Sequence, residues 1–320
     1  MNRYLRRTVI TAKLESPYGT DATPTGADDA LLVSNMSINP YEATYAERPV
    51  VRGYMGGNDQ IPGAASITMS FDIELAGSGT ANTAPAWGKL LQACGFAEAV
   101  LTTPNRVEYT PISAAFKGLT IYWYDDGVLH KAVGCMGTLK LAAKINEIPK
   151  FTFEFTGVYA GESAVSNVTP TLTAWKTPVV VAKANVVDIT LGCSYSAGAL
   201  TGGTVYTTDG LELDVGNQVA FNPMLNAETV DISDRAITGS AQFDLTAAQE
   251  VDFMTAIKAG TLTGLGLTIG TTSGNKFILF GPAVQRTAPA KAELNGARVL
   301  GYTLGFKPLA GNDELRLVQV

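Results

Sequence analysis

The chain has 320 residues, of which 46% are apolar and only 16% are charged. Disordered chains show the opposite balance, so this composition predicts a folded protein with a substantial core. The 23 Lys and Arg residues and 29 Asp and Glu residues leave a net charge of −6. An acidic chain of this kind is not a basic module built to grip nucleic acid.

Cysteine and histidine content argues against a disulfide scaffold and against a zinc site. Cys94, Cys135 and Cys193 are widely spaced, and His130 is the only histidine. Three unpaired cysteines favour a reducing compartment. The N-terminus lacks the apolar stretch of a signal peptide, and no run of about 18 apolar residues occurs. We therefore expect synthesis in the cytoplasm and no membrane span.

Strict alternation of apolar and polar residues predicts that the fold is mainly β. In Ser66–Leu75 every odd position is apolar and every even position is polar. Phe151–Thr156 and Ile237–Leu245 repeat this pattern, which a strand with one buried face produces. Tyr122–His130 predicts a hairpin, because Asp126-Gly127 supplies residues that tolerate a tight turn.

Two segments predict short helices instead. Residues 85–94 begin with a proline and stop before Gly95, the usual helix punctuation. Residues 246–259 open with Thr246 and carry Gln249 three positions later, which is a capping box. The apolar residues expected on the buried face of this second helix are Val251, Phe253, Met254 and Ile257.

The order of these elements occurs twice along the chain. The matched positions are Asn39-Pro40 with Asn222-Pro223, Phe71-Asp72-Ile73 with Phe243-Asp244-Leu245, Gly95 with Gly260, Gly127 with Gly274, Gly134 with Gly281, and Phe151–Phe155 with Leu300–Leu304. Such ordered self-similarity indicates a duplication. We predict two related β domains, residues 1–163 and 174–320, joined by a Ser/Thr/Pro-rich linker over residues 164–173.

The largest length difference between the two copies is a long loop, expected at Tyr41–Ala65 in the first copy. It contains charged residues and four glycines. Loops of this length in compact domains are usually functional or disordered.

The chain resembles the tail tube proteins of long-tailed bacteriophages. The resemblance is carried by Thr11–Leu32, by Ile38-Asn39-Pro40, and by the alternating strand Ser66–Leu75 followed by a short helix and a hairpin. It implies two β-sandwich or half-barrel domains, each with one short helix, that assemble into a continuous inner β-barrel tube. The length fits two-domain members, in which three chains form the ring that six single-domain chains form elsewhere.

The resemblance implies a structural virion protein of the phage tail and not an enzyme, with no cofactor and no metal. Trimeric, pseudo-hexameric rings would stack into a tube through which double-stranded DNA passes into the host, in a non-contractile tail by preference. The implied partners are further copies of the chain, the tail terminator, tape measure and tail tip proteins, and transiently viral DNA.

Site residues can be assigned on this basis. A wall that bound DNA through Lys and Arg would hold it, so passage favours neutral or acidic walls. The residues expected to face the lumen are Asp72, Glu74, Glu154 and Asp244. The residues of the long loop expected to contact the next ring are Glu47, Arg48, Arg52, Tyr54 and Met55. A mobile surface loop is the alternative for this second set.

Other functions remain open from the residues alone. The inner tube of a contractile machine is a related possibility. A tandem β-sandwich module for carbohydrate binding or adhesion would need exposed aromatic platforms, and Trp87, Trp123 and Trp175 are few and scattered. The basic residues Arg3, Arg6 and Arg7 favour an N-terminal arm that grips an acidic neighbour.

Overall fold

The computed structural model describes residues 2–320, with the side chains of all of these except residues 187 and 188. Within this part of the chain lie twenty strands, two α-helices and one short 3₁₀ helix. Sixteen strands form one sheet, and two hairpins form separate two-stranded sheets. The prediction of a mainly β fold is confirmed.

The elements follow one another as the sequence analysis predicts, with additional strands between them. Up to residue 164 they are η1 (Leu5–Arg7), β1 (Thr8–Leu14), β2 (Ser34–Glu47), β3 (Gln60–Glu74), α1 (Gly88–Ala93), β4 (Phe96–Thr102), β5 (Asn105–Pro111), β6 (Leu119–Asp125), β7 (Val128–Lys144) and β8 (Lys150–Ala164). The remainder are β9 (Val186–Leu191), β10 (Ser194–Ser196), β11 (Ala199–Thr201), β12 (Thr204–Val205), β13 (Thr208–Asp214), β14 (Asn217–Met224), β15 (Ala227–Arg235), β16 (Thr238–Phe243), α2 (Ala247–Lys258), β17 (Leu262–Ile269), β18 (Phe277–Leu294), β19 (Ala297–Lys307) and β20 (Arg316–Gln319).

Alternation along the strands directs their apolar residues into one core. On β3, Ile67, Phe71 and Ile73 are at most 1% exposed, and on the neighbouring β8 the same holds for Phe151 and Phe153. Burying each such side chain contributes about 1.5–3 kcal/mol, so this pair of strands is a major source of stability. The core runs on through residues of both halves of the chain.

One sheet connects the two halves. Its central section is the antiparallel order β18-β19-β16-β13-β7-β8-β3-β2, in which β13 of the second half pairs with β7 of the first. A second connection is made by β20, which pairs with β5 on one side and β18 on the other. The halves are therefore joined by backbone hydrogen bonds at two places.

The pairing order of the first half recurs in the second. The neighbours β6-β7-β8-β3-β2 correspond to β17-β18-β19-β16-β13, and β9 pairs with β17 as β1 pairs with β6. α1 follows β3 and α2 follows β16, which is the same place in each order. The division into domains at residues 163 and 174 stays a prediction, which this recurrence supports.

The helices differ in how well the sequence predicts them. α2 begins after Thr246, whose side chain accepts from the Gln249 backbone while the Gln249 side chain accepts from the Thr246 backbone, so the capping box is confirmed. Phe253 is its buried residue, however, and Val251 is 64% exposed. The expected apolar face is wrong at Val251, because α2 docks on the core through Phe253 and Ile257, and Val251 points to solvent. α1 is shorter than expected and ends before Gly95.

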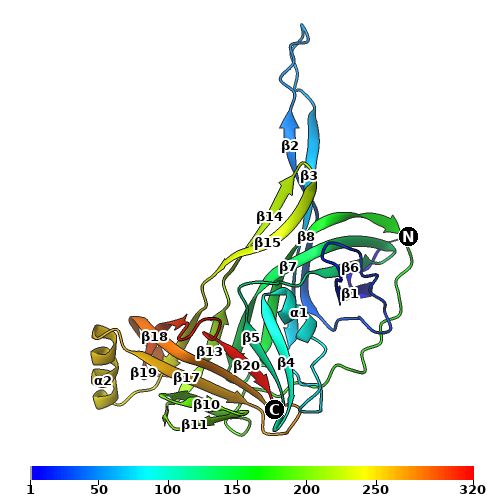
Figure 1. Cartoon of the computed structure of the whole chain (residues 1–320). Coiled ribbons are helices and arrows are strands. Elements are labelled where there is room, and N and C mark those ends of the chain that lie inside the picture. The colour runs from blue at the N-terminus through cyan, green and yellow to red at the C-terminus, as the bar shows by residue number, and fades with distance from the viewer. Residues whose placement is uncertain (1) are drawn as a thin grey trace.

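The segment expected to be a long loop is mostly paired strand. β2 continues to Glu47 and β3 starts at Gln60, so the loop itself comprises residues 48–59. Figure 1 shows that this hairpin extends far beyond the body, and that the β14–β15 hairpin rises in the same direction. The alternation of apolar and polar residues is absent between residues 41 and 47, because neither face of a projecting hairpin is buried.

Candidate functional site

A polar surface covers the central strands of the sheet on the side opposite the core. One row of cross-strand neighbours runs Asp72, Thr152, Lys140, Asp214 and Thr238 across five strands. The next row contains Glu74, Lys150, Ala142, Glu212, Ser240 and Thr303. We call the surface formed by these rows and by Ser70, Glu154, Thr138 and Lys144 the polar face.

Each lysine of the polar face is paired with a carboxylate. Lys140 Nζ lies 3.1 Å from Glu154 Oε1, and Lys144 Nζ lies 2.5 Å from Glu212 Oε1. The Glu154 and Glu212 carboxylates raise the pKa of these two lysines through hydrogen bonds. The polar face carries three lysines and five carboxylates, which are Asp72, Glu74, Glu154, Glu212 and Asp214. The face is therefore slightly acidic.

Asp72 is the most deeply embedded of the four carboxylates expected at a lumen. It is 5% exposed and accepts hydrogen bonds from Lys150 (2.6 Å), Thr152 (2.6 Å) and Asn35 (2.7 Å). Burial alone would raise the pKa of Asp72, but these three bonds outweigh burial and lower it. Asp72 thus holds the face together and presents little charge to solvent.

The other three predicted carboxylates are exposed. Glu74 lies opposite Lys150 in the β3–β8 pairing, and Glu154 is half-exposed beside Lys140. Asp244 follows the last residue of β16, and its backbone N–H donates to the Thr207 carbonyl at 3.0 Å. The polar face thus contains Asp72, Glu74 and Glu154, while Asp244 lies at its margin. Whether any of them faces a channel stays a proposal.

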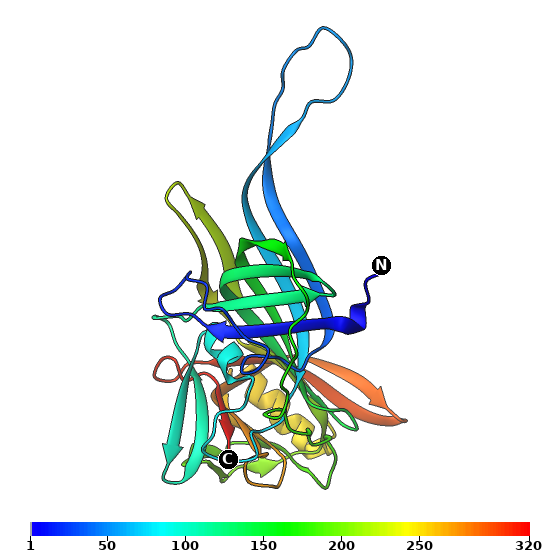
Figure 2. The ribbon, with the colours of Figure 1, turned by 90° about the vertical axis from the view of Figure 1, so that its right-hand side faces the viewer.

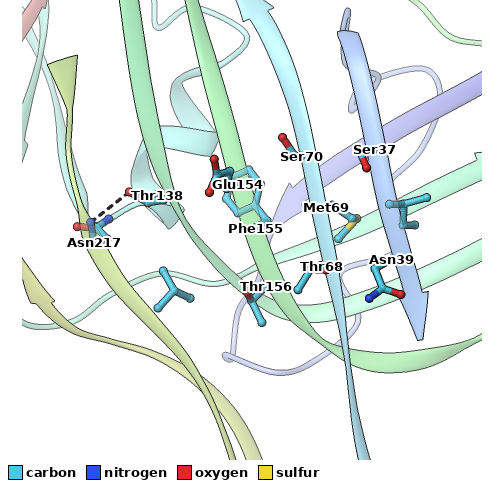
Figure 3. A pocket seen from close by; sticks show the side chains of 12 residues that line it. Ser37, Asn39, Thr68, Met69, Ser70, Thr138, Glu154, Phe155, Thr156 and Asn217 are labelled. Atoms are coloured by element: carbon cyan, nitrogen blue, oxygen red, sulfur yellow. Dashed lines mark hydrogen bonds between the residues drawn. The ribbon is translucent and has the colours of Figure 1, made fainter. Parts of the chain in front are cut away.

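A shallow hollow of about 460 Å³ lies on the polar face where β2, β3, β8 and β7 meet the start of β14. Figure 3 shows that its labelled polar side chains are mainly hydroxyls and amides, with Glu154 as the carboxylate. The Asn217 backbone N–H donates to Thr138 Oγ1 at 3.1 Å, which anchors β14 to β7. Hydroxyl and amide groups dominate this lining, and no nucleophile paired with a base occurs among its residues.

The residues expected to contact a neighbouring ring lie at or beside the β2–β3 tip. Glu47 ends β2, and Tyr54 and Met55 are 73% and 101% exposed. Arg48 and Arg52 both bond Asp59, at 2.7 and 2.6 Å, and this clamp shapes the loop. In the free chain the two arginines are thus paired within their own loop.

Sequence reasoning missed a second exposed tip. Met224, the last residue of β14, and Leu225, in the turn that follows it, are 75% and 110% exposed. The two hairpins rise side by side in Figure 2. The matched Asn-Pro pairs at 39–40 and 222–223 were the available signal, since they mark corresponding positions in the two hairpins.

The central sheet has two open edges. β2 pairs only with β3 among the described residues, and β18 from Arg286 to Leu294 pairs only with β19. Open edges of this length are ready to pair with another chain. All seven pairings across the eight strands are antiparallel, so β2 and β18 run in opposite directions.

The basic N-terminal cluster is held by the chain's own acidic hairpin. Arg3 forms an ion pair with Asp125, and Arg7 Nη1 lies 3.3 Å from Asp126 Oδ1. The Tyr4 backbone N–H donates to Asp126 Oδ2 at 2.8 Å. The expected acidic neighbour of the arm is therefore the β6–β7 turn of the same chain.

A sequence model of the phage tail tube protein family matches residues 6–308. The chain belongs to this family. It is a structural protein of the phage tail, as the resemblance implied, and self-assembly into a tube follows from membership. No curated protein matched the chain in sequence.

Two of the three tryptophans are buried. Trp87 and Trp123 are 2% and 3% exposed, which removes them as platforms for a sugar ring. Over residues 2–320, neither helix is long and apolar enough to cross a membrane.

Proposed function

We propose that this tail tube protein forms trimeric, pseudo-hexameric rings that stack into a tube for double-stranded DNA. The observation that carries the proposal is the pair of open, oppositely directed edges on β2 and β18. If β2 of one chain pairs antiparallel with β18 of the next, the sheet continues from chain to chain and every pairing in it stays antiparallel. Closing the ring removes every open edge of the central sheet.

The chain already contains a template for this junction. β13 occupies the place of β2 in the second half, and β7 occupies the place of β18 in the first. The β13–β7 pairing within one chain therefore corresponds to the β2–β18 pairing between chains. Three chains, each with two such halves, would give six similar units around the axis.

The two projecting tips support stacking. Both tips expose large apolar side chains to solvent. These are Tyr54 and Met55 on the longer hairpin, and Met224 and Leu225 on the shorter one. Their burial against a neighbouring ring would contribute apolar anchors of the kind that dominate interfaces. A head-to-tail contact of this type repeats without closing and yields a tube.

The polar face supports a lumen role. Its lysines are already paired with carboxylates, so they offer little to phosphate. Excess carboxylate charge and abundant hydroxyls would keep DNA hydrated and unbound, in line with passage. Asp72, Glu74, Glu154 and Asp244 are proposed as part of this wall. At its ends and inside, the tube would meet the tail terminator, tape measure and tail tip proteins of a non-contractile tail.

Negative-stain microscopy of the purified chain tests the proposal directly. We expect rings with a central bore, and filaments of stacked rings at higher protein concentration. A particle that stays a single chain at all concentrations would refute ring formation. Image classes with six equivalent subunits of 320 residues would refute the trimer.

A further inference from the structure

Arg286 is a buried cation without an anionic partner. It is 7% exposed, its buried Nε has no hydrogen-bond partner, and no ion pair to it is found among the described residues. Its guanidinium carbon lies 4.3 Å above the ring of Phe253, the buried residue of α2. Burying an unpaired charge is costly, and buried arginines are normally paired with a carboxylate or phosphate.

A second unsatisfied polar group lies in the same cluster. Tyr302 is 3% exposed and its hydroxyl has no hydrogen-bond partner. Its ring lies 5.6 Å from that of Phe253, which places it beside the arginine. The nearby carboxylate of Glu250 is engaged by Lys291 at 3.0 Å. Two buried donors, one of them charged, are therefore left for an acceptor from outside the chain.

The position of Arg286 indicates where that acceptor comes from. β17 pairs with β18 as far as Gln285, so Arg286 is the first residue of the open edge. Leu262, the partner of Gln285, is 48% exposed and forms an apolar border there. A neighbour that pairs with this edge would cover the guanidinium and exclude water from it.

We propose that Arg286 and Tyr302 form a receptor site for a carboxylate of a second copy of the chain, which is inserted when the ring closes. This inference rests on the proposed ring. An acidic chain of net charge −6 has carboxylates to supply, and the guanidinium fork matches a carboxylate in two parallel bonds. The pair would form in a desolvated environment at the edge of the junction, where charge complementarity also fixes register.

Arg286→Met tests the site, because methionine keeps an apolar stem over Phe253 and removes the charge. The measurement is the critical concentration for ring formation, obtained by sedimentation over a salt series, together with the unfolding midpoint of the dilute chain. For Arg286→Met we expect the critical concentration for ring formation to rise about tenfold or more. Arg286→Lys keeps the positive charge, so its critical concentration should lie between those of the wild type and Arg286→Met. Lys13→Met removes one exposed positive charge on β1, which pairs with β6 and not with β18, and is the matched control, expected to assemble like the wild type.

The outcomes separate the two proposals. If the wild-type chain forms no rings, the proposed function fails. If it forms rings and Arg286→Met forms them at the wild-type concentration, the receptor site is wrong and Arg286 serves only α2 packing. If Arg286→Met does not fold, Tyr302→Phe decides: a rise of several-fold supports the site, and an unchanged critical concentration overturns it.

Discussion

The hydroxyl of Tyr195 donates to the buried carboxylate of Glu108 across 2.7 Å, and this bond links a strand of the first half to one of the second. The same carboxylate accepts from Arg106 at 2.6 Å and pairs with Arg316 on the C-terminal strand. Burial would raise the pKa of Glu108, but these donors lower it. Glu108 therefore connects the first half of the chain to the second through one hydrogen bond and one ion pair.

Replacing Glu108 with glutamine should therefore destabilise the whole chain. The variant keeps the shape but leaves two arginines without their anion, at an expected cost of about 2–4 kcal/mol in the free energy of unfolding. Glu228→Gln, on the exposed β15, is the control and should change stability by no more than about 0.5 kcal/mol. Urea unfolding measures both. Equal stabilities for the two variants would show that Glu108 does not join the halves.

A close backbone crossing gives a second prediction. A Cβ atom on Gly77 would lie 1.9 Å from the Gly274 carbonyl oxygen, so Gly77→Ala must push the two halves apart. We expect a loss of about 2 kcal/mol or more, in line with overpacking. Gly57→Ala meets nothing within 4 Å and should leave the unfolding midpoint unchanged. A neutral Gly77→Ala would contradict the geometry of this crossing.

The embedded carboxylate of Asp72 predicts a pH-dependent contribution to stability. Its folded pKa is lowered below the value of about 3.9 expected for the unfolded chain. The contribution is therefore complete above about pH 4 and disappears as pH falls through the lower, folded pKa. Asp72→Asn should cost about 1–2 kcal/mol at pH 7, since Lys150 is partly exposed. The gap between wild type and variant, measured by urea unfolding, should narrow toward pH 3. A gap that does not vary with pH would exclude the ion pair as its source.

Removing the β2–β3 tip should separate folding from stacking. Replacing residues 49–58 with a two-residue Asn-Gly turn removes the exposed apolar groups and leaves the paired strands in place. Rings should still form, while filaments should be lost in electron micrographs. Replacing Arg52 with lysine keeps the charge beside Asp59 and should retain filaments. Normal filaments from the shortened chain would remove this tip from the stacking contact.

Added positive charge on the polar face should convert a passive wall into one that holds DNA. Thr152→Lys and Ser240→Lys together would place six new charges in a three-chain ring. We expect salt-sensitive retention of double-stranded DNA that falls steeply between 50 and 200 mM salt. Val251→Lys and Thr255→Lys together also add six charges to the ring, on the exposed side of α2 and outside the proposed bore, and should retain far less. Equal retention by both variants would place the polar face elsewhere than on the lumen.

Sequence patterns predicted those parts of the fold that depend on local periodicity. The alternation of Ile67, Phe71 and Ile73 identified β3 because that strand has one buried and one wet face. The capping box identified the start of α2 because both of its hydrogen bonds are local. The repeated order of elements was visible because each copy builds the same local pattern.

Features that depend on distant partners were not predicted. The alternation placed Asp72 on the polar face but could not show its burial, since Lys150 lies 78 residues away in sequence. Arg286 gave no signal, because an arginine in a strand is ordinarily exposed and the ring of Phe253 beneath it belongs to another element. The strands inside residues 41–65 were missed because a projecting ribbon has no apolar period.

The unequal hairpins have a consequence for rotational symmetry. β2 and β3 have 14 and 15 residues, whereas β14 and β15 have 8 and 9. In a ring of three chains, the long β2–β3 hairpins and the short β14–β15 hairpins would alternate around the rim. A ring stacked on this rim could bind in three equivalent rotational orientations, whereas a rim of six identical hairpins would allow six. The duplicated chain would therefore restrict the rotation of each added ring more than a ring of six identical subunits does.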